Sequence, residues 1–179
     1  MKREPHGKPN MGNRLNKHLF LDKSNILYDI DAMTALVSRS RRNENNTDDT
    51  LATSESDQYR PLFDRWIEKY TQNVKARLKA YILTPMRIAS MNDLKTWKEC
   101  EIILSFPPSW NDTVYESIVS AIHDYIVNGC LYEYFSLTLT SKDPVTVDCM
   151  QKMLDSYQAM KSYACAVIPG TIHKPLEPF

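Results

Sequence analysis

The sequence predicts a mostly α fold: a helical bundle with a long antiparallel helical hairpin, one short strand element, and extended N- and C-terminal arms. Apolar residues recur at three- and four-residue steps over residues 59–83, 113–138 and 144–165, which is the period of one helix face. A β-branched run at 99–106 is followed by two prolines, and both ends of the chain are polar and lack a period. The length of 179 residues suits one domain.

The first part of the chain, residues 1–57, is predicted to be an N-terminal arm and linker. Residues 1–24 are polar, basic and without period, so we expect them to be disordered in isolation. In NILYDIDAMTALV, residues 25–37, apolar side chains first alternate and then fit a short helix. Residues 38–57 change from basic to acidic and hold almost no large apolar side chain, which is typical of a linker or long loop.

The helical core domain is predicted to span residues 58–166, and its first element is a long helix near 59–83. The apolar face of this helix consists of Phe63, Trp66, Ile67, Tyr70, Val74, Leu78, Tyr81 and Ile82. The segment ECEIILSF, residues 99–106, is the best strand candidate because its centre is β-branched. Pro107 and Pro108 end any regular element there.

The first helix of the hairpin is predicted to begin near Thr113. Thr113 and Glu116 have the spacing of a capping box, and Asn111 and Asp112 are rival caps. An apolar stripe then follows one face of a helix that extends to about residue 138. The stripe consists of Val114, Ile118, Ile122, Tyr125, Gly129 and Tyr132.

The second helix, residues 144–165, has a start signal of its own. Asp143 suits the N-cap, and Pro144 suits the first helical position, where no N–H bond is lost. The short connection before it can join only antiparallel neighbours. Its core-facing stripe is predicted to consist of Val147, Met150, Leu154, Tyr157, Lys161 and Ala164. The proline-rich tail, residues 167–179, is predicted to be extended.

No catalytic, metal-binding or cofactor-binding residue is predicted. The four glycines are scattered and cannot form a phosphate-binding loop. His123 and Asp124 are adjacent but point about 100° apart on a helix, so they should not form a dyad. The cysteines lack zinc or redox spacing, and Cys130 and Cys149 should lie too far apart for a disulfide. No run approaches the ~20 apolar residues of a membrane span, so we expect no membrane contact. Because no catalytic or cofactor-binding residues are predicted, we also expect no small-molecule substrate.

Charge is unevenly distributed, although the formal net charge is zero. Residues 1–42 carry nine Lys or Arg and four Asp or Glu, whereas residues 43–179 carry thirteen and eighteen. We therefore expect the basic arm and the acidic body to attract each other, within one chain or between copies. The same cations would suit phosphate contacts with DNA, which makes a nucleic-acid-binding adaptor that uses the basic arm the alternative function.

The segment from residue 26 to residue 42 is the predicted interface. Its apolar side chains would supply binding energy, and its arginines would set register and encounter rate against an acidic surface. The interface candidates are Ile26, Leu27, Tyr28, Ile30, Met33, Leu36, Arg39, Arg41 and Arg42.

Four segments carry a family resemblance: YDIDAMTALVSRSRR, LFDRWIEKYTQNVKARLKAYI, FPPSW and VSAIHDYIVNGCLYEYFSLT. In this order they resemble the small neck, or head–tail connector, proteins of tailed bacteriophages, especially crAss-like phages of Bacteroidota. The resemblance covers residues 25–179 and implies a small helical protein that is repeated in a ring below the portal. It further implies contacts with the portal or other neck and tail proteins, and no catalysis. It also implies a place in the virion neck after synthesis in the bacterial host cytoplasm.

Overall fold

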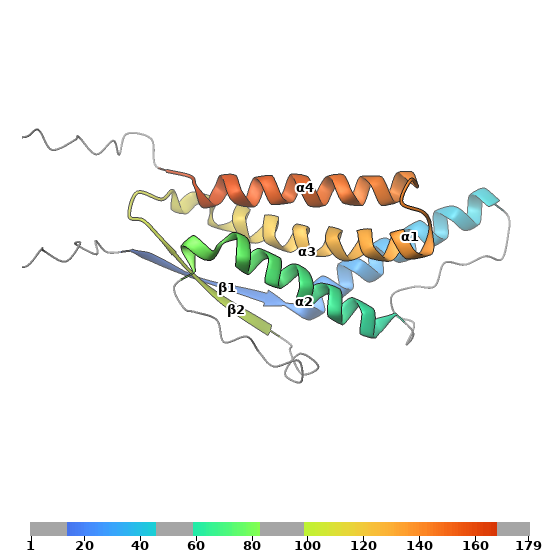
Figure 1. The fold of residues 1–179 in the computed structure, drawn as a ribbon, viewed down its shortest axis with the longest axis horizontal. Coiled ribbons are helices and arrows are strands. Elements are labelled where there is room, and N and C mark those ends of the chain that lie inside the picture. The colour runs from blue at the N-terminus through green and yellow to red at the C-terminus, as the bar shows by residue number, and fades with distance from the viewer. Residues whose placement is uncertain (1–13, 46–58, 83–98, 168–179) are drawn as a thin grey trace, which may run out of the picture.

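Residues 14–45, 59–82 and 99–167 are described by the computed structural model of this chain (Figure 1). The described part is mostly helical, as predicted. Its elements, in chain order, are β1 (Leu15–Asp22), α1 (Lys23–Asn45), α2 (Arg60–Arg77), a 3-10 turn (Lys79–Tyr81), β2 (Glu99–Phe106), a second 3-10 turn (Asp112–Val114), α3 (Tyr115–Thr138) and α4 (Pro144–Ala164). None of the described helices is both long and apolar enough to cross a membrane.

Helices α3 and α4 form the predicted antiparallel hairpin, and α3 is the central element. In Figure 1, α4 lies along one side of α3, and α2 and α1 lie against α3 on other sides. Packing against three helices explains why α3 buries side chains around much of its circumference, from Ile118 to Phe135. Both helices of the hairpin lie within two residues of their predicted ranges, which is the ordinary uncertainty of a helix end.

Both helices of the hairpin follow polar caps. Asn111 accepts a hydrogen bond from the backbone N–H of Thr113 at 3.2 Å and begins the 3-10 turn that leads into α3. The side-chain cap is therefore the rival candidate Asn111, and the predicted capping box is not used. Asp143 caps α4 as predicted, because its carboxylate accepts from the N–H of Val145 at 3.0 Å and Pro144 follows it.

The expectation that residues 1–24 lack structure is wrong for their second half. Strand β1 pairs with β2 in an antiparallel two-stranded sheet, with Leu15 opposite Phe106 and Asp22 opposite Glu99. The segment LNKHLFLD alternates weakly, with Leu19 and Leu21 buried and Phe20 exposed. Its strand conformation depends on a partner far along the chain, so a local search for a core-forming pattern misses it.

Residues 23–45 form one helix, α1, in place of the predicted alternating segment, short helix and linker. Ile26, Ile30, Thr34 and Ser38 recur every four residues and are all buried. Two of these four, Thr34 and Ser38, are small and polar, so a search for large apolar side chains at helical spacing does not detect this stripe. The part of the predicted linker from residue 46 to residue 57 lies outside the described residues.

The predicted core stripe of α4 is wrong in its first half, whereas Ala164 is buried as predicted and Tyr157 packs against the core. Val147, Met150 and Leu154 are 44%, 36% and 45% exposed. The buried residues of α4 are Thr146, Cys149, Met160 and Ala164. Helix α4 therefore has two stripes, and the less apolar one faces α3, because only one side of α4 lies against the bundle.

One hydrophobic core joins the predicted arm to the helical body. The buried cluster includes Leu19 from β1 and Ile26 from α1 together with Phe63 from α2 and Ile122 from α3. The described residues of the predicted arm are thus part of the core that the hairpin helices build. The tail from residue 168 to residue 179 lies outside the described residues.

Candidate interaction surface

Three of the predicted interface residues contribute to the core of their own chain. Ile26 and Ile30 are fully buried, and Leu27 is 5% exposed. Met33 is half-buried and packs against the same core. These side chains stabilise the docking of α1 on the bundle, and in this conformation they are not available to a second molecule.

Tyr28 and Leu36 lie on the outer side of α1 and remain surface candidates. Tyr28 is 72% exposed and Leu36 is 57% exposed. Arg39 is also exposed, whereas the side chain of Arg42 lies outside the described part of the chain. An interface role for these residues stays a prediction.

Arg41 has an acidic partner within its own chain. Its guanidinium Nη2 lies 2.7 and 2.6 Å from the two carboxylate oxygens of Asp143, the N-cap of α4. Lys17 and Lys23 also have acidic partners within the chain, because each forms an ion pair, with Asp112 and Asp64 respectively. Attraction between the basic N-terminal part and the acidic body therefore operates inside one molecule at these three positions.

His123 forms a pair that sequence adjacency did not indicate. Its Nε2 lies 2.7 Å from Asp29 Oδ2, so the imidazole links α3 to α1. Asp124 instead accepts a hydrogen bond from Ser120, one turn away on the same helix. The separation of His123 from Asp124 that helix geometry predicts is thus present, and no sequence signal pointed to Asp29.

The described thiols are free, and two of them are buried. Cys130 and Cys149 are buried, and Cys165 is exposed. Burial raises the pKa of the Cys130 thiol well above its ordinary value, and it raises the pKa of Cys149 to about 11. Such thiols stay protonated near neutral pH and are poor nucleophiles and metal ligands.

The outward stripe of α4 is a surface feature that sequence reasoning assigned to the core. Val147, Met150 and Leu154 follow one another at helical spacing, and Leu137 of α3 is 65% exposed near the same end of the hairpin. The spacing itself was visible in the sequence. What the sequence lacked was a signal for which of the two stripes of α4 meets α3.

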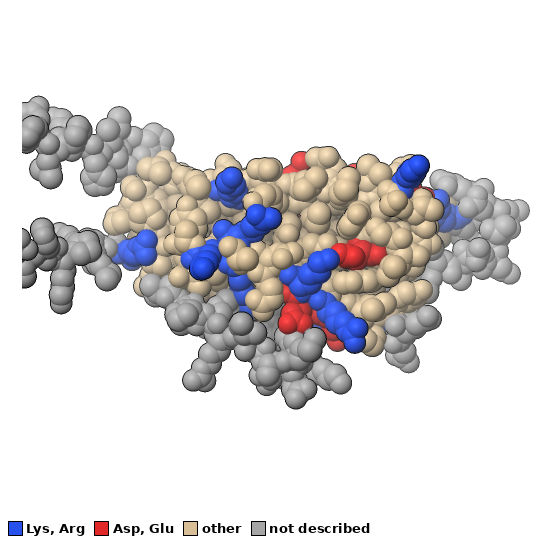
Figure 2. Space-filling view, viewed as in Figure 1, with Lys and Arg blue, Asp and Glu red and all other residues tan. Residues whose placement is uncertain are grey.

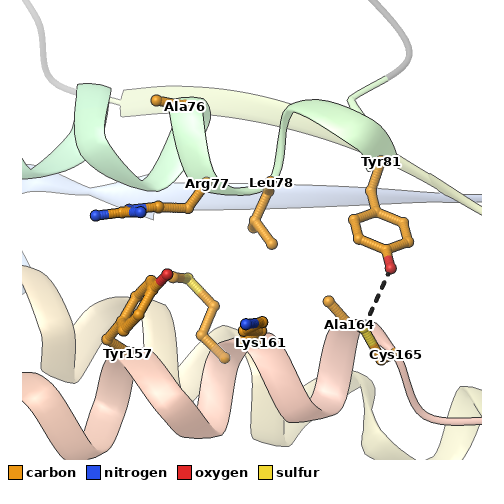
Figure 3. A pocket seen from close by; sticks show the side chains of 9 residues that line it. Ala76, Arg77, Leu78, Tyr81, Tyr157, Lys161, Ala164 and Cys165 are labelled. Atoms are coloured by element: carbon orange, nitrogen blue, oxygen red, sulfur yellow. Dashed lines mark hydrogen bonds between the residues drawn. The ribbon is translucent and has the colours of Figure 1, made fainter.

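A basic pocket of about 350 Å³ lies between the end of α2 and the last turns of α4 (Figure 3). Arg77 and Lys161 line it beside Tyr81 and Tyr157, with an apolar floor that includes Met160. The Arg77 guanidinium lies 4.9 Å from the centre of the Tyr157 ring, a cation–π arrangement that holds its charge at the pocket. None of the described residues that line the pocket is acidic.

Other cations lie close to this pocket. Figure 2 shows Lys and Arg side chains gathered over the C-terminal part of α2 and the adjoining surface of α4. Lys75 and Arg77 belong to the last turn of α2, and Lys79 follows in the 3-10 turn. This end of the molecule therefore presents a positive surface to solvent.

An acidic open groove lies on the other flank of α4, between α4 and α3. Glu116 and Asp124 line it from α3, and Asp155 lines it from α4. The remaining lining residues are mostly small: Ser117, Ser120, Ala121, Ser156, Ala159 and Tyr163. The groove holds no cation among its described lining residues.

Within the described ranges, no group of three or more His, Cys, Asp or Glu side chains could hold a metal ion. The described surface carries the exposed apolar stripe of α4 and two hollows of opposite charge.

Comparison of the chain with protein-family models, curated proteins and solved structures found no significant match in any of the three.

Proposed function

We propose that this chain is a structural, non-catalytic virion protein: a ring-forming component of the neck, or head–tail connector, of a tailed phage. The sequence resemblance supports the family, and the helical hairpin agrees with the helical protein that this resemblance implies. The proposed partners are further copies of the chain in a ring and the portal or other neck and tail proteins. The proposed location is the neck of the virion.

The observation that carries the proposal is the apolar stripe on the outer side of α4. Val147, Met150 and Leu154 are each more than one third exposed although they lie on a well-formed helix of the main hairpin. Burying such a side chain stabilises a contact by up to roughly 1.5–3 kcal/mol. A repeated contact between copies would remove this stripe from water in every subunit.

The alternative, a nucleic-acid-binding adaptor that uses the basic arm, has less support. Three cations of the described arm, Lys17, Lys23 and Arg41, already pair with carboxylates of the same chain. Phosphate contacts by these side chains would first have to break those pairs. DNA contact through the rest of the arm stays a prediction.

The test is the assembly state of the full chain, measured by sedimentation velocity and negative-stain imaging over a range of concentrations. We expect the parent to form rings. The double substitution Val147→Ser with Leu154→Ser should reduce the number of copies in each particle and leave the helical circular dichroism signal unchanged. Phe20→Ser, at a 61% exposed site on β1, is the matched control and should assemble like the parent.

One outcome would contradict the ring-forming function, and another would contradict the contact assigned to α4. A parent chain that stays monomeric at every concentration would reject a ring-forming role. Unchanged rings in the stripe variant would show that α4 does not supply the contact between copies.

A further inference from the structure

The two flanks of α4 carry opposite charge along the same stretch of the helix. Residues 157–165 of α4 line the basic pocket on the α2 side, with Arg77 and Lys161 as its cations. Residues 155–163 of α4 line the acidic groove on the α3 side, with Glu116, Asp124 and Asp155 as its carboxylates. One molecule thus presents two complementary surfaces at one level of the hairpin.

We propose that the partner of each flank is a second copy of this chain, with the basic flank of one copy seated on the acidic flank of the next. This inference rests on the proposed ring-forming function and deepens it, because it names the two surfaces that meet. Complementary charge is the observation that identifies the occupant: each flank offers what the other lacks.

The acidic groove has room for long side chains of a partner. The acidic groove is lined largely by serine and alanine, which leaves room for long side chains from a partner. The basic flank supplies such side chains in Arg77 and Lys161. The hydrogen-bond donors that the groove's own chain gives to Asp124 and Asp155 are the neutral side chains of Ser120 and Gln151, at 3.4 and 2.8 Å.

The apolar stripe lies on the basic side of α4. Val147, Leu154 and Lys161 follow one another at intervals of seven residues, so they share one side of the helix. Contact through the basic flank would therefore bring Leu154 against the neighbouring copy as well. The charges would set the register, and the stripe would add burial of apolar surface.

Two different surfaces make a heterologous contact, which repeats from copy to copy and does not stop at a dimer. Such a contact closes into a ring when successive copies are related by rotation, and it gives an open filament when they also advance along the axis. Both flanks occupy residues 155–165 of α4, so successive copies meet at the same height. The contact therefore has no built-in shift of successive copies along α4.

Charge reversal tests the pairing. One variant carries Arg77→Glu with Lys161→Glu, and the other carries Asp124→Lys with Asp155→Lys. Each variant alone should associate at least about tenfold more weakly than the parent, because like charges then face each other. An equimolar mixture of the two should regain association, since every basic surface again has an acidic one to meet. Lys142→Glu, at the exposed hairpin turn, is the matched control and should assemble like the parent.

The readout is the sedimentation of each variant and of the mixture, with circular dichroism melting to show that each variant folds. If the parent assembles and either reversed variant assembles equally well, or if the mixture of folded variants fails to associate, the pairing of these flanks is wrong and the ring-forming function stands. A parent that never assembles rejects the ring-forming function itself, and this inference with it. If the Arg77/Lys161 variant loses binding to duplex DNA but keeps normal assembly, the basic flank serves nucleic acid, which also overturns the pairing.

Discussion

At Gly129, helix α3 passes directly under the ring of Tyr70. A Cβ atom at this position would lie 2.5 Å from Tyr70 Cε1, well inside normal contact. The ring is held along this same face of α3, because it packs edge-on against Tyr125 at 5.6 Å and its hydroxyl donates to Glu133 at 3.2 Å. The close approach of α2 to α3 therefore requires a residue without a side chain at this point.

Gly129→Ala should destabilise the fold by about 1–3 kcal/mol, although alanine is the better helix former by about 1 kcal/mol. Denaturant unfolding measures the change. In a Tyr70→Ala background the clash is absent, so the same substitution should be neutral or stabilising there. If Gly129→Ala stabilises the parent chain, the packing of α2 on α3 differs from that described.

The buried thiols predict a loss of stability at alkaline pH. The ordinary pKa of a cysteine thiol is 9.0. Burial raises the pKa of Cys149 to about 11 and the pKa of Cys130 well above 9. Above pH 9 the unfolded chain therefore binds fewer protons than the folded chain, and the free energy of unfolding falls as pH rises. The stability that the two protonated thiols contribute is fully present below pH 9, and it is lost progressively as the pH rises towards 11.

Denaturant unfolding between pH 7 and pH 10 measures this effect. The double variant Cys130→Ala with Cys149→Ala should show a shallower decline above pH 9, whatever its stability at neutral pH. Cys165→Ala, at an exposed thiol, should keep the slope of the parent. Equal slopes in all three proteins would mean that the two thiols are not protected from ionisation.

At the scale of elements, β1 makes residues 15–22 part of the folded core and not of a disordered arm. Leu19 is fully buried, whereas its neighbour Phe20 is 61% exposed on the other face of the strand. Leu19→Ala should therefore cost about 2–5 kcal/mol, and Phe20→Ala should cost far less despite the larger side chain removed. Thermal or denaturant melts decide this. Equal effects would return residues 15–22 to the disordered arm that the composition alone predicts.

Helix α4 is joined to α1 through its own N-cap. Asp143 caps the helix and also accepts hydrogen bonds from Arg41 Nη2 with both carboxylate oxygens, so one carboxylate performs two functions. Asp143→Ala removes both and should cost about 1–3 kcal/mol, whereas Asp143→Asn keeps the cap and should cost less. Arg41→Ala should resemble Asp143→Asn and add little to it in the double variant. Full additivity, measured by denaturant unfolding, would show that the pair contributes nothing.

At the scale of the molecule, α1 and the far end of the hairpin belong to one core. Ile30 is fully buried in α1, and Trp110 closes the other end, where it stacks on Phe106 at 3.9 Å and donates to the Tyr163 carbonyl at 2.9 Å. A shared core predicts one cooperative transition for the described part of the chain.

Ile30→Ala should lower stability by about 2–5 kcal/mol and shift the whole transition together. The measurement uses a variant in which Trp66 and Trp97 are phenylalanine, so that fluorescence reports on Trp110 alone while circular dichroism reports on the helices. Two separate midpoints would show that α1 unfolds apart from the hairpin.

Much of the fold could be predicted from the chain, but little of the candidate surface could. Asp143 and Pro144 mark the start of α4 by local chemistry, and they are where the sequence places them. The partner of His123 is 94 residues away and that of Arg41 is 102 residues away, so neither pair leaves a local signal. The charged flanks of α4 combine residues of three helices, which become neighbours only on folding.

The sequence by itself determined that this protein is mostly helical and where the two helices of its hairpin begin and end, because helical period, caps and proline act over a few residues. Only the tertiary structure decided that residues 15–22 form a strand, that Ile26 and Ile30 belong to the core, and that Val147, Met150 and Leu154 face outward. The reason is that burial depends on which surfaces meet. Where an element has two apolar stripes or only a weak one, the elements packed against it decide which of its side chains are buried.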